Sequence, residues 1–401
     1  MNHPEALDRC VGDARTFLNE YWAKAPLYRG ATSPDAFDDL LTLDDVDRVL
    51  TERGLRYPAL RLVKDGQTLS PDTYTKTVRM QSRRVDDVID AARVYAHFGD
   101  GATIVLQALH RYWEPLFHFC RELETALTHP VQVNTYLTPP RARGLDVHYD
   151  THDVFVLQVS GSKMWKVYGS AVDLPLANQH RRGRSFPDPG SPQIDVELKP
   201  GDCLYIPRGF LHSAETARSE STHMTVGILV YRWMDVLKSV LDGAGNELFM
   251  REALPPGFAH DPEALAREIP NKLAEVSRWL TEQDPLATAG AFSDRFWGGR
   301  PPLLTGQLRQ VLDLDEIQDA SLVQQRKGAV CKLKREADDV VVILGDRRLR
   351  MPAHAAPALE KILEGAEIEV GDLDAGLDSE SRIVLVRRLI TEGLVEQLPR
   401  A

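Results

Sequence analysis

The chain has 401 residues with a formal net charge of -11, and 43% of its residues are hydrophobic. This composition is ordinary for a globular protein, the acidic balance disfavours a general nucleic-acid binder, and no run of 18 apolar residues could cross a membrane. Because MNHPEALDRC lacks the features of a secretory signal and the four cysteines are scattered, we expect a cytoplasmic protein with reduced thiols.

The first 130 residues are predicted to be mainly helical, with connecting turns. Apolar residues recur at helical spacing in residues 8–30, and this pattern stops at Pro26. Two further amphipathic helices are predicted at 86–98 and 107–127, the second with a kink at Pro115. The N-terminal part is therefore expected to be a helical elaboration of the domain that follows.

From residue 131 the apolar period changes to two, which indicates β-strands. Glycine and proline turns separate these runs, and residues 180–186 (HRRGRSF) are expected to form a mobile loop between strands. Several antiparallel strands at this spacing predict a closed barrel or a double-sheet jelly roll. The predicted strand segments are 131–137, 154–161, 163–169, 194–209 and 222–233.

Beyond residue 232 the helical pattern returns, with predicted helices at 234–254 and 262–283. Residues 328–352 are predicted to form a hairpin that is followed by helix, turn and helix, an order typical of a winged helix-turn-helix. A DNA-binding regulator is therefore one alternative. However, residues 326–401 contain 13 Lys and Arg against 14 Asp and Glu, net -1, whereas DNA binding usually needs a basic stripe.

The segment HYDTHDVFVLQ (148–158) places a histidine and an aspartate at the start of a strand-like run. Residues i and i+2 of a strand share a face, so His148 and Asp150 converge. The turn-rich segment GDCLYIPRGFLH ends at His212 on a neighbouring strand. Two histidines and one carboxylate leave open positions on Fe(II). The competing ligands are His152, which has the same strand parity, Asp153 and His223.

Other polar residues are candidates for binding a ligand inside the barrel. Lys163 would be costly there without an anionic partner, which a dicarboxylate would provide, and Lys166 is its rival. Asn134 and Tyr136 share one face of their predicted strand. Thr225 could offer a hydroxyl to the same interior.

With these motifs the chain resembles the JmjC-type, cupin-fold 2-oxoglutarate oxygenases of the ribosomal oxygenase branch. The resemblance implies that His148, Asp150 and His212 bind Fe(II). It also implies that Lys163 pairs with the distal carboxylate of 2-oxoglutarate, in a pocket that Asn134, Tyr136 and Thr225 line. The matching segments are FLNEYWAKAPLYRG, NTYLTPPRARGLDVHYDTHDVFVLQVSGSKMWKVYG, LKPGDCLYIPRGFLHSAET, STHMTVGI and REALPPGF.

The resemblance implies an α+β chain in three parts. These are a double-stranded β-helix (jelly-roll, cupin) JmjC domain with N-terminal helices at 1–231, a helical dimerisation region at 232–300 and a winged-helix-like domain at 301–401. The implied function is hydroxylation of a residue in a ribosomal or other basic protein, with succinate and CO2 as co-products. The implied assembly is a homodimer without direct nucleic-acid binding. Two alternatives remain: a hydroxylase of a small peptide or free amino acid, and a metal-binding cupin without oxygen chemistry.

Overall fold

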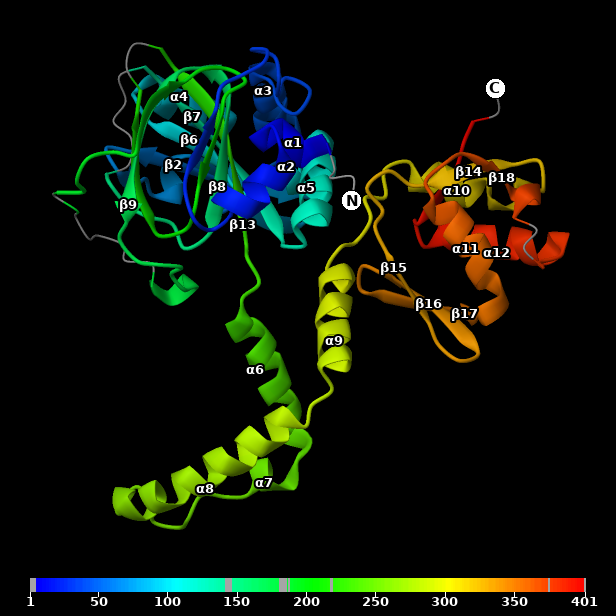
Figure 1. Cartoon of the computed structure of the whole chain (residues 1–401). Helices are drawn as coiled ribbons and strands as arrows, with labels where there is room; N and C mark the ends of the chain where they lie inside the picture. Colours follow the sequence, from blue (N-terminus) through cyan, green and yellow to red (C-terminus); the bar gives the residue numbers. More distant parts are fainter. Residues whose placement is uncertain are drawn as a thin grey trace. The chain divides into compact units, whose positions relative to one another are not determined.

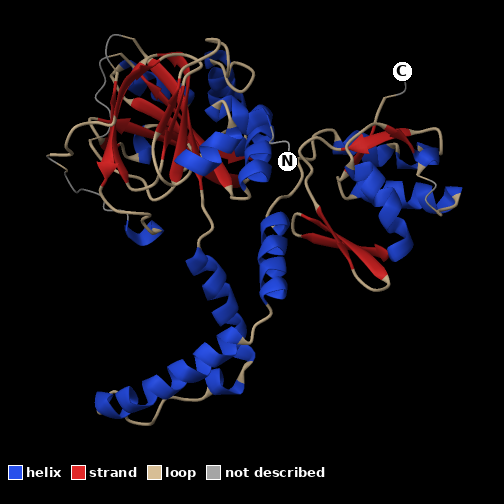
Figure 2. Cartoon of the chain, in the orientation of Figure 1, coloured by secondary structure: helices blue, strands red, loops and turns tan. Residues whose placement is uncertain are grey.

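The computed structural model describes residues 5–140, 146–179, 186, 188–216, 219–373 and 376–399. The chain divides into two compact units, Met1–Val230 and Tyr231–Ala401 (Figure 1). The first unit contains most of the strands with helices against them, and the second begins with helices (Figure 2). No helix among the described residues is long and apolar enough to span a membrane.

The predicted helix over 8–30 is broken into shorter pieces. These are α1 (Glu5–Val11), α2 (Ala14–Thr16) and a π-helical turn at Phe17–Tyr21. Gly12 adopts a φ of +85°, which ends α1, and the Asp13 side chain then accepts from the backbone N–H of Thr16 to begin α2. A glycine in the left-handed region followed by an aspartate cap therefore outweighs the apolar spacing.

The mainly helical prediction for the N-terminal region missed several strands. Only α3 (Leu43–Glu52), α4 (Ala91–Gly99) and α5 (Glu114–Leu127) continue the helical pattern there. The predicted helix at 86–98 is wrong in its first part, because β-branched residues of β5 pair with β4 and the helix begins only after Asp90. The missed strands are β1 (Leu27–Arg29), β2 (Leu60–Lys64), β3 (Gln67–Thr68), β4 (Thr75–Met80), β5 (Arg83–Ile89) and β6 (Thr103–Leu106).

The predicted helix over 107–127 begins later than expected. A short 3-10 turn at Leu109–Arg111 precedes α5, and Pro115 lies in the first turn of α5 instead of kinking it. Proline is well suited to that position because its missing N–H has no intrahelical partner there. Buried residues such as Leu116, Cys120 and Leu123 fix α5 against the sheet side of the core.

The large sheet of the first unit has eight strands in the order β1-β11-β8-β13-β7-β6-β2-β3. A second sheet has the order β10-β9-β12. The predicted strand segments are strands in the structure, except that 194–209 divides into two strands at the Pro200–Gly201 turn. The strands are β7 (Val131–Thr138), β8 (Asp153–Gly161), β9 (Lys163–Ser170), β10 (Ile194–Leu198), β11 (Cys203–Ile206), β12 (Phe210–Glu215) and β13 (Ser221–Ile228).

Alternate residues of the large sheet enter two different cores. On β8, Phe155 and Leu157 pack into the core on the helix side, whereas Val154 and Val156 pack against the second sheet together with Trp165. The two sheets therefore face each other across an apolar layer, as the jelly-roll prediction expects. The predicted mobile loop at 180–186 lies almost entirely outside the described residues.

The second unit starts with α6 (Trp233–Gly243), α7 (Leu248–Arg251), α8 (Pro262–Thr281) and α9 (Pro285–Gly298). The predicted hairpin at 328–352 is a three-stranded sheet, β15-β16-β17. A second small sheet has the order β18-β14-β19. The remaining elements are α10 (Gln307–Leu312), β14 (Leu322–Gln325), β15 (Lys332–Arg335), β16 (Asp339–Leu344), β17 (Arg347–Pro352), α11 (Ala356–Leu363), β18 (Ile368–Glu369), α12 (Ser379–Thr391) and β19 (Val395–Gln397).

Candidate metal centre

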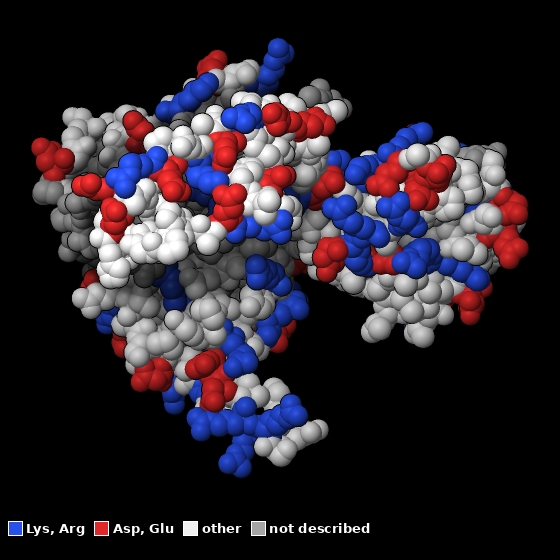
Figure 3. Space-filling view, turned by 90° about the horizontal axis from the view of Figure 1, so that it is seen from below, with Lys and Arg blue, Asp and Glu red and all other residues white. Residues whose placement is uncertain are grey.

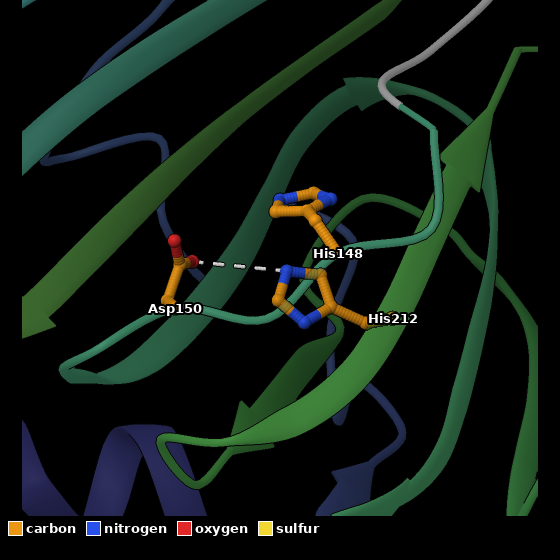
Figure 4. Close-up of side chains that lie close together, drawn as sticks. All are labelled: His148, Asp150 and His212. Atoms are coloured by element: carbon orange, nitrogen blue, oxygen red, sulfur yellow. Dashed lines mark ion pairs between the residues drawn. The ribbon is translucent and has the colours of Figure 1, made fainter. Parts of the chain in front are cut away.

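Two histidines and one aspartate meet at the edge of the layer between the two sheets. Ligand atoms of His148, Asp150 and His212 all lie within 4.8 Å of one another. Their side chains converge on one point, and His212 Nε2 lies 3.7 Å from Asp150 Oδ2 (Figure 4). His212 belongs to β12, whereas His148 and Asp150 lie in an extended segment before β8 and not inside a regular strand.

Backbone hydrogen bonds hold the two segments that carry these side chains. His148 N–H donates to the carbonyl of His212 at 3.1 Å, and His212 N–H donates to the carbonyl of His148 at 2.8 Å. The N–H of Gly209 also donates to the carbonyl of Asp150 at 2.9 Å. Gly209 has a φ of +88°, and a Cβ there would lie 2.0 Å from the carbonyl oxygen of Val172. Only glycine fits this turn without displacing the backbone.

The hydrogen bonds of both imidazoles leave the same ring nitrogen available. His148 Nδ1 lies 2.8 Å from the carbonyl of Asp146, and His212 Nδ1 lies 3.1 Å from the carbonyl of Phe210. A carbonyl only accepts, so each Nδ1 carries the proton and each Nε2 keeps its lone pair. This arrangement of a second hydrogen bond is typical of metal-binding histidines.

The electrostatic environment keeps His212 neutral. Burial lowers its pKa to about 4, with a further contribution from His148, while Asp150 opposes the shift. A neutral imidazole is the form that binds a metal. The donor set of two imidazoles and one carboxylate therefore fits a divalent metal such as Fe(II) and leaves positions for other ligands.

Asp153, a competing candidate, has a different environment. Its side chain is completely buried and forms an ion pair with Arg208, with Oδ2 3.2 Å from Nη1. Oδ1 accepts from the hydroxyl of Tyr205 at 3.0 Å and from the backbone N–H of Arg208 at 3.2 Å. Desolvation raises the pKa of Asp153, and Arg208 opposes this shift. The pair connects the start of β8 to the turn before His212.

The other two competitors also lie apart from the ligand cluster. The His152 ring lies against the backbone of Gly227, where a Cβ would be 2.6 Å from its Cδ2. His223 is buried, stacks on Tyr136 with ring centroids 5.1 Å apart, and lines the cavity described next. Burial and the nearby Lys163 lower the pKa of His223 well below its ordinary value.

A cavity of about 750 Å³, including space open to solvent, adjoins the three ligand residues. Lys163 lines it and is buried, and its Nζ donates to Thr138 Oγ1 at 3.3 Å. Burial lowers the pKa of Lys163 to about 8. Its rival Lys166 lies opposite Asp195 on β10 and does not line the cavity. A buried ammonium beside a hydroxyl suits an anionic ligand.

The other predicted pocket residues separate into two groups. Tyr136 and Thr225 line the cavity, but Asn134 does not. The Asn134 Oδ1 accepts from the backbone N–H of Ala108 at 3.0 Å, and Ala108 adopts a φ of +51°. Asn134 therefore supports the turn before α5 in this structure.

Arg61 lines the cavity and was not predicted. It lies on β2, where Leu60 and Leu62 are buried in the helix-side core while Arg61 and Val63 face the cavity. The alternation of LRLV is the sequence signal that could have revealed it. Trp165 was likewise unassigned and lies on the wall, with its ring centroid 6.2 Å from that of His212.

Comparison with known proteins places a JmjC domain at residues 107–236. The chain is 32% identical to the bifunctional lysine-specific demethylase and histidyl-hydroxylase NO66 of Drosophila persimilis, over 53% of this chain and 29% of the fly protein. It is 27% identical to ribosomal oxygenase 2 of Mus musculus, over 96% of this chain and 89% of the mouse protein.

The fold resembles that of the Escherichia coli ribosomal oxygenase YcfD in complex with cobalt and 2-oxoglutarate. The TM-score is 0.56 at 20% identity, covering 96% of this chain and 98% of YcfD. The chain spans less than a third of the length of the NO66 relatives that it matches. The predicted resemblance to the JmjC ribosomal oxygenase branch and the mixed helix–sheet cupin fold are confirmed.

Proposed function

Because the chain carries a JmjC domain like those of ribosomal oxygenases, we propose that it is an Fe(II)- and 2-oxoglutarate-dependent protein hydroxylase. The observation that carries the proposal is the convergence of His148, Asp150 and His212 beside a cavity that contains a buried lysine. A metal alone would not explain Lys163, and an anion site alone would not explain the ligand cluster.

In this proposal the three side chains hold Fe(II) through His148 Nε2, His212 Nε2 and the Asp150 carboxylate. Lys163 binds the distal carboxylate of 2-oxoglutarate, with Tyr136 and Thr225 beside it. The iron and co-substrate, when bound, supply the oxidant by which one oxygen atom of O2 enters a C–H bond and the other enters succinate, with release of CO2. The apolar walls at Val154, Val156 and Ile206 limit water around the reacting atoms.

We further propose that the substrate is a residue of a ribosomal or other basic protein, as the names of the relatives indicate. On the face shown in Figure 3, acidic and basic side chains are interspersed, so a single charged patch does not define the docking site there. The net charge of -11 supports a basic partner.

We propose that helices α6–α8 mediate homodimerisation. None of their residues is buried within the chain, although they carry large apolar side chains. Trp233 is 81% exposed, Leu248 71% and Leu273 63%. Apolar surface of this kind is typical of a protein interface. We also keep the winged-helix interpretation for residues 301–401 as a structural or interaction unit, and a cytoplasmic location, which the four free thiols support.

The proposed function is tested by anaerobic titration of the full-length protein with Fe(II) and then 2-oxoglutarate. We expect one Fe(II) per chain and a visible charge-transfer band when 2-oxoglutarate chelates the metal. Iron binding without a band or any 2-oxoglutarate binding would contradict the oxygenase function and favour a metal-binding cupin. Incubation with ribosomal proteins and with free amino acids, followed by mass spectrometry for one added oxygen atom, separates protein from small-molecule hydroxylation.

A further inference from the structure

The cavity contains a second cation, Arg61, at a fixed place in the sheet. Arg61 on β2 lies opposite Val105 on β6, and Val105 lies opposite Tyr136 on β7. All three line the cavity. Arg61 is within hydrogen-bonding reach of the Tyr136 hydroxyl, which also interacts with Thr225. The guanidinium is therefore held on the same sheet face as Tyr136.

Lys163 marks a different place in the same cavity. Its ammonium donates to Thr138, which lies two residues after Tyr136 on β7 and lines the cavity from the same face. Two residues of a strand span about 7 Å. Arg61 and Lys163 are thus fixed to two points that are separated along one strand.

The two points differ in their distance from the ligand cluster. The charge of Asp150 influences Tyr136, whereas burial is the sole cause of the pKa shift of Lys163. The Arg61–Tyr136 point is therefore on the metal side of the cavity. Among the described residues that line the cavity, Asp150 is the sole carboxylate, and it faces the metal position. Neither cation has a carboxylate of its own there.

We propose that Arg61 binds the metal-chelating carboxylate (C1) of 2-oxoglutarate, while Lys163 binds the distal carboxylate (C5). This inference rests on the proposed function. The carboxyl carbons of a five-carbon dicarboxylate are about 5 Å apart from bond lengths alone, which suits two cations anchored at Tyr136 and Thr138. Arg61 then orients the co-substrate at the metal, and Tyr136 positions Arg61.

The test compares two probes on the Mn(II)-loaded full-length protein without oxygen. 2-Oxoglutarate has both carboxylates, whereas 2-oxovalerate keeps the C1 carboxylate and keto group but has a methyl group in place of the distal carboxylate. Their affinities are measured at millimolar concentrations by water-proton relaxation of the bound Mn(II). Arg61→Gln is expected to weaken both probes by the same factor, about tenfold or more. Lys163→Gln is expected to weaken 2-oxoglutarate alone.

Matched controls separate this role from a general effect on folding. Arg56→Gln removes an exposed arginine near β2 whose Nε donates to the carbonyl of Asp86, and is expected to leave both affinities unchanged. Arg61→Lys keeps the charge and is expected to recover part of the loss for both probes. Each variant is compared for its thermal unfolding midpoint.

Two outcomes would overturn the proposal. If Arg61→Gln weakens 2-oxoglutarate but not 2-oxovalerate, Arg61 belongs to the distal carboxylate site. If neither affinity changes, Arg61 does not contact the co-substrate. Failure of the proposed function has a different signature, because the unaltered Mn(II)-loaded protein would then bind neither probe.

Discussion

His148 and His212 exchange both of their backbone hydrogen bonds, at 3.1 Å and 2.8 Å, although 63 residues separate them in the chain. The side chains of this pair lie with ring centroids 4.4 Å apart. The same contact that joins the two segments thus sets the distance between two predicted metal ligands. Loss of either side chain removes a donor without removing the backbone pairing.

His148→Ala and His212→Ala are each expected to abolish stoichiometric Fe(II) binding, because two remaining donors hold a divalent ion weakly. Metal content after dialysis against limiting chelator measures this. His152→Ala is the matched control and is expected to keep one metal ion per chain, since its ring lies against Gly227 instead of the cluster. Full metal content in His148→Ala would refute the ligand assignment.

The affinity for 2-oxoglutarate is expected to depend on pH through Lys163. Burial lowers its pKa in the empty cavity to about 8, so below that pH the ammonium is charged before binding and the affinity is constant. Above it, binding takes up a proton, and the affinity falls about tenfold per pH unit. Calorimetry of the Mn(II)-loaded protein between pH 7 and 9.5 measures this. Lys163→Gln is expected to remove the dependence and Lys166→Gln to keep it; a flat profile for the unaltered protein would rule it out.

The Asp153–Arg208 ion pair is expected to matter for stability and for metal affinity together. Asp153→Ala leaves a buried guanidinium without its partner, which costs about 3–5 kcal/mol. The turn before His212 then loses its connection to β8, so metal affinity also falls. Urea unfolding and Co(II) titration measure the two effects. The exposed pair Arg84–Asp86 provides the control, and Asp86→Ala is expected to change stability by less than about 1 kcal/mol.

Gly209→Ala is expected to destabilise the protein and weaken metal binding. Its Cβ would overlap the carbonyl of Val172 at a φ of +88°, a conformation that costs a residue with a side chain about 1–3 kcal/mol. Relief by backbone movement would pull Gly209 N–H from Asp150. Gly257→Ala is the comparison, with a φ of +84° and nothing within 4 Å of the added Cβ. Equal metal affinities for the two variants would show that strain alone, and not the contact, matters.

A dimer is expected to depend on the exposed apolar face of α6. Leu237 and Leu241 are 52% and 39% exposed and lie one helical turn apart. The double substitution L237E/L241E is expected to give a monomer by analytical ultracentrifugation, with an unchanged far-UV spectrum. Lys238→Glu, on another side of the same helix, serves as the charge control. A monomeric unaltered protein at micromolar concentration would contradict the interface.

The sequence predicted the central strands and the three clustered residues because their signals are local. Alternation identifies β7 and β8, and HxD followed by a turn-rich segment ending in histidine identifies the cluster. The N-terminal strands were missed because residues 86–89 also fit helical spacing, and only pairing with β4 makes them a strand. Arg61 was missed for a similar reason, since its place beside Tyr136 depends on pairing between β2, β6 and β7.

The position of β13 has a consequence for the order of events during synthesis. β13 is the last strand of its sheet along the chain, yet it pairs with both β7 and β8 in the middle of that sheet. A nascent chain that ends before Ser221 has all three clustered residues but lacks the strand that joins the two halves of the sheet. Closure of the cavity must therefore wait until residue 228 has left the ribosome, so a truncated chain would contain the ligands without the pocket.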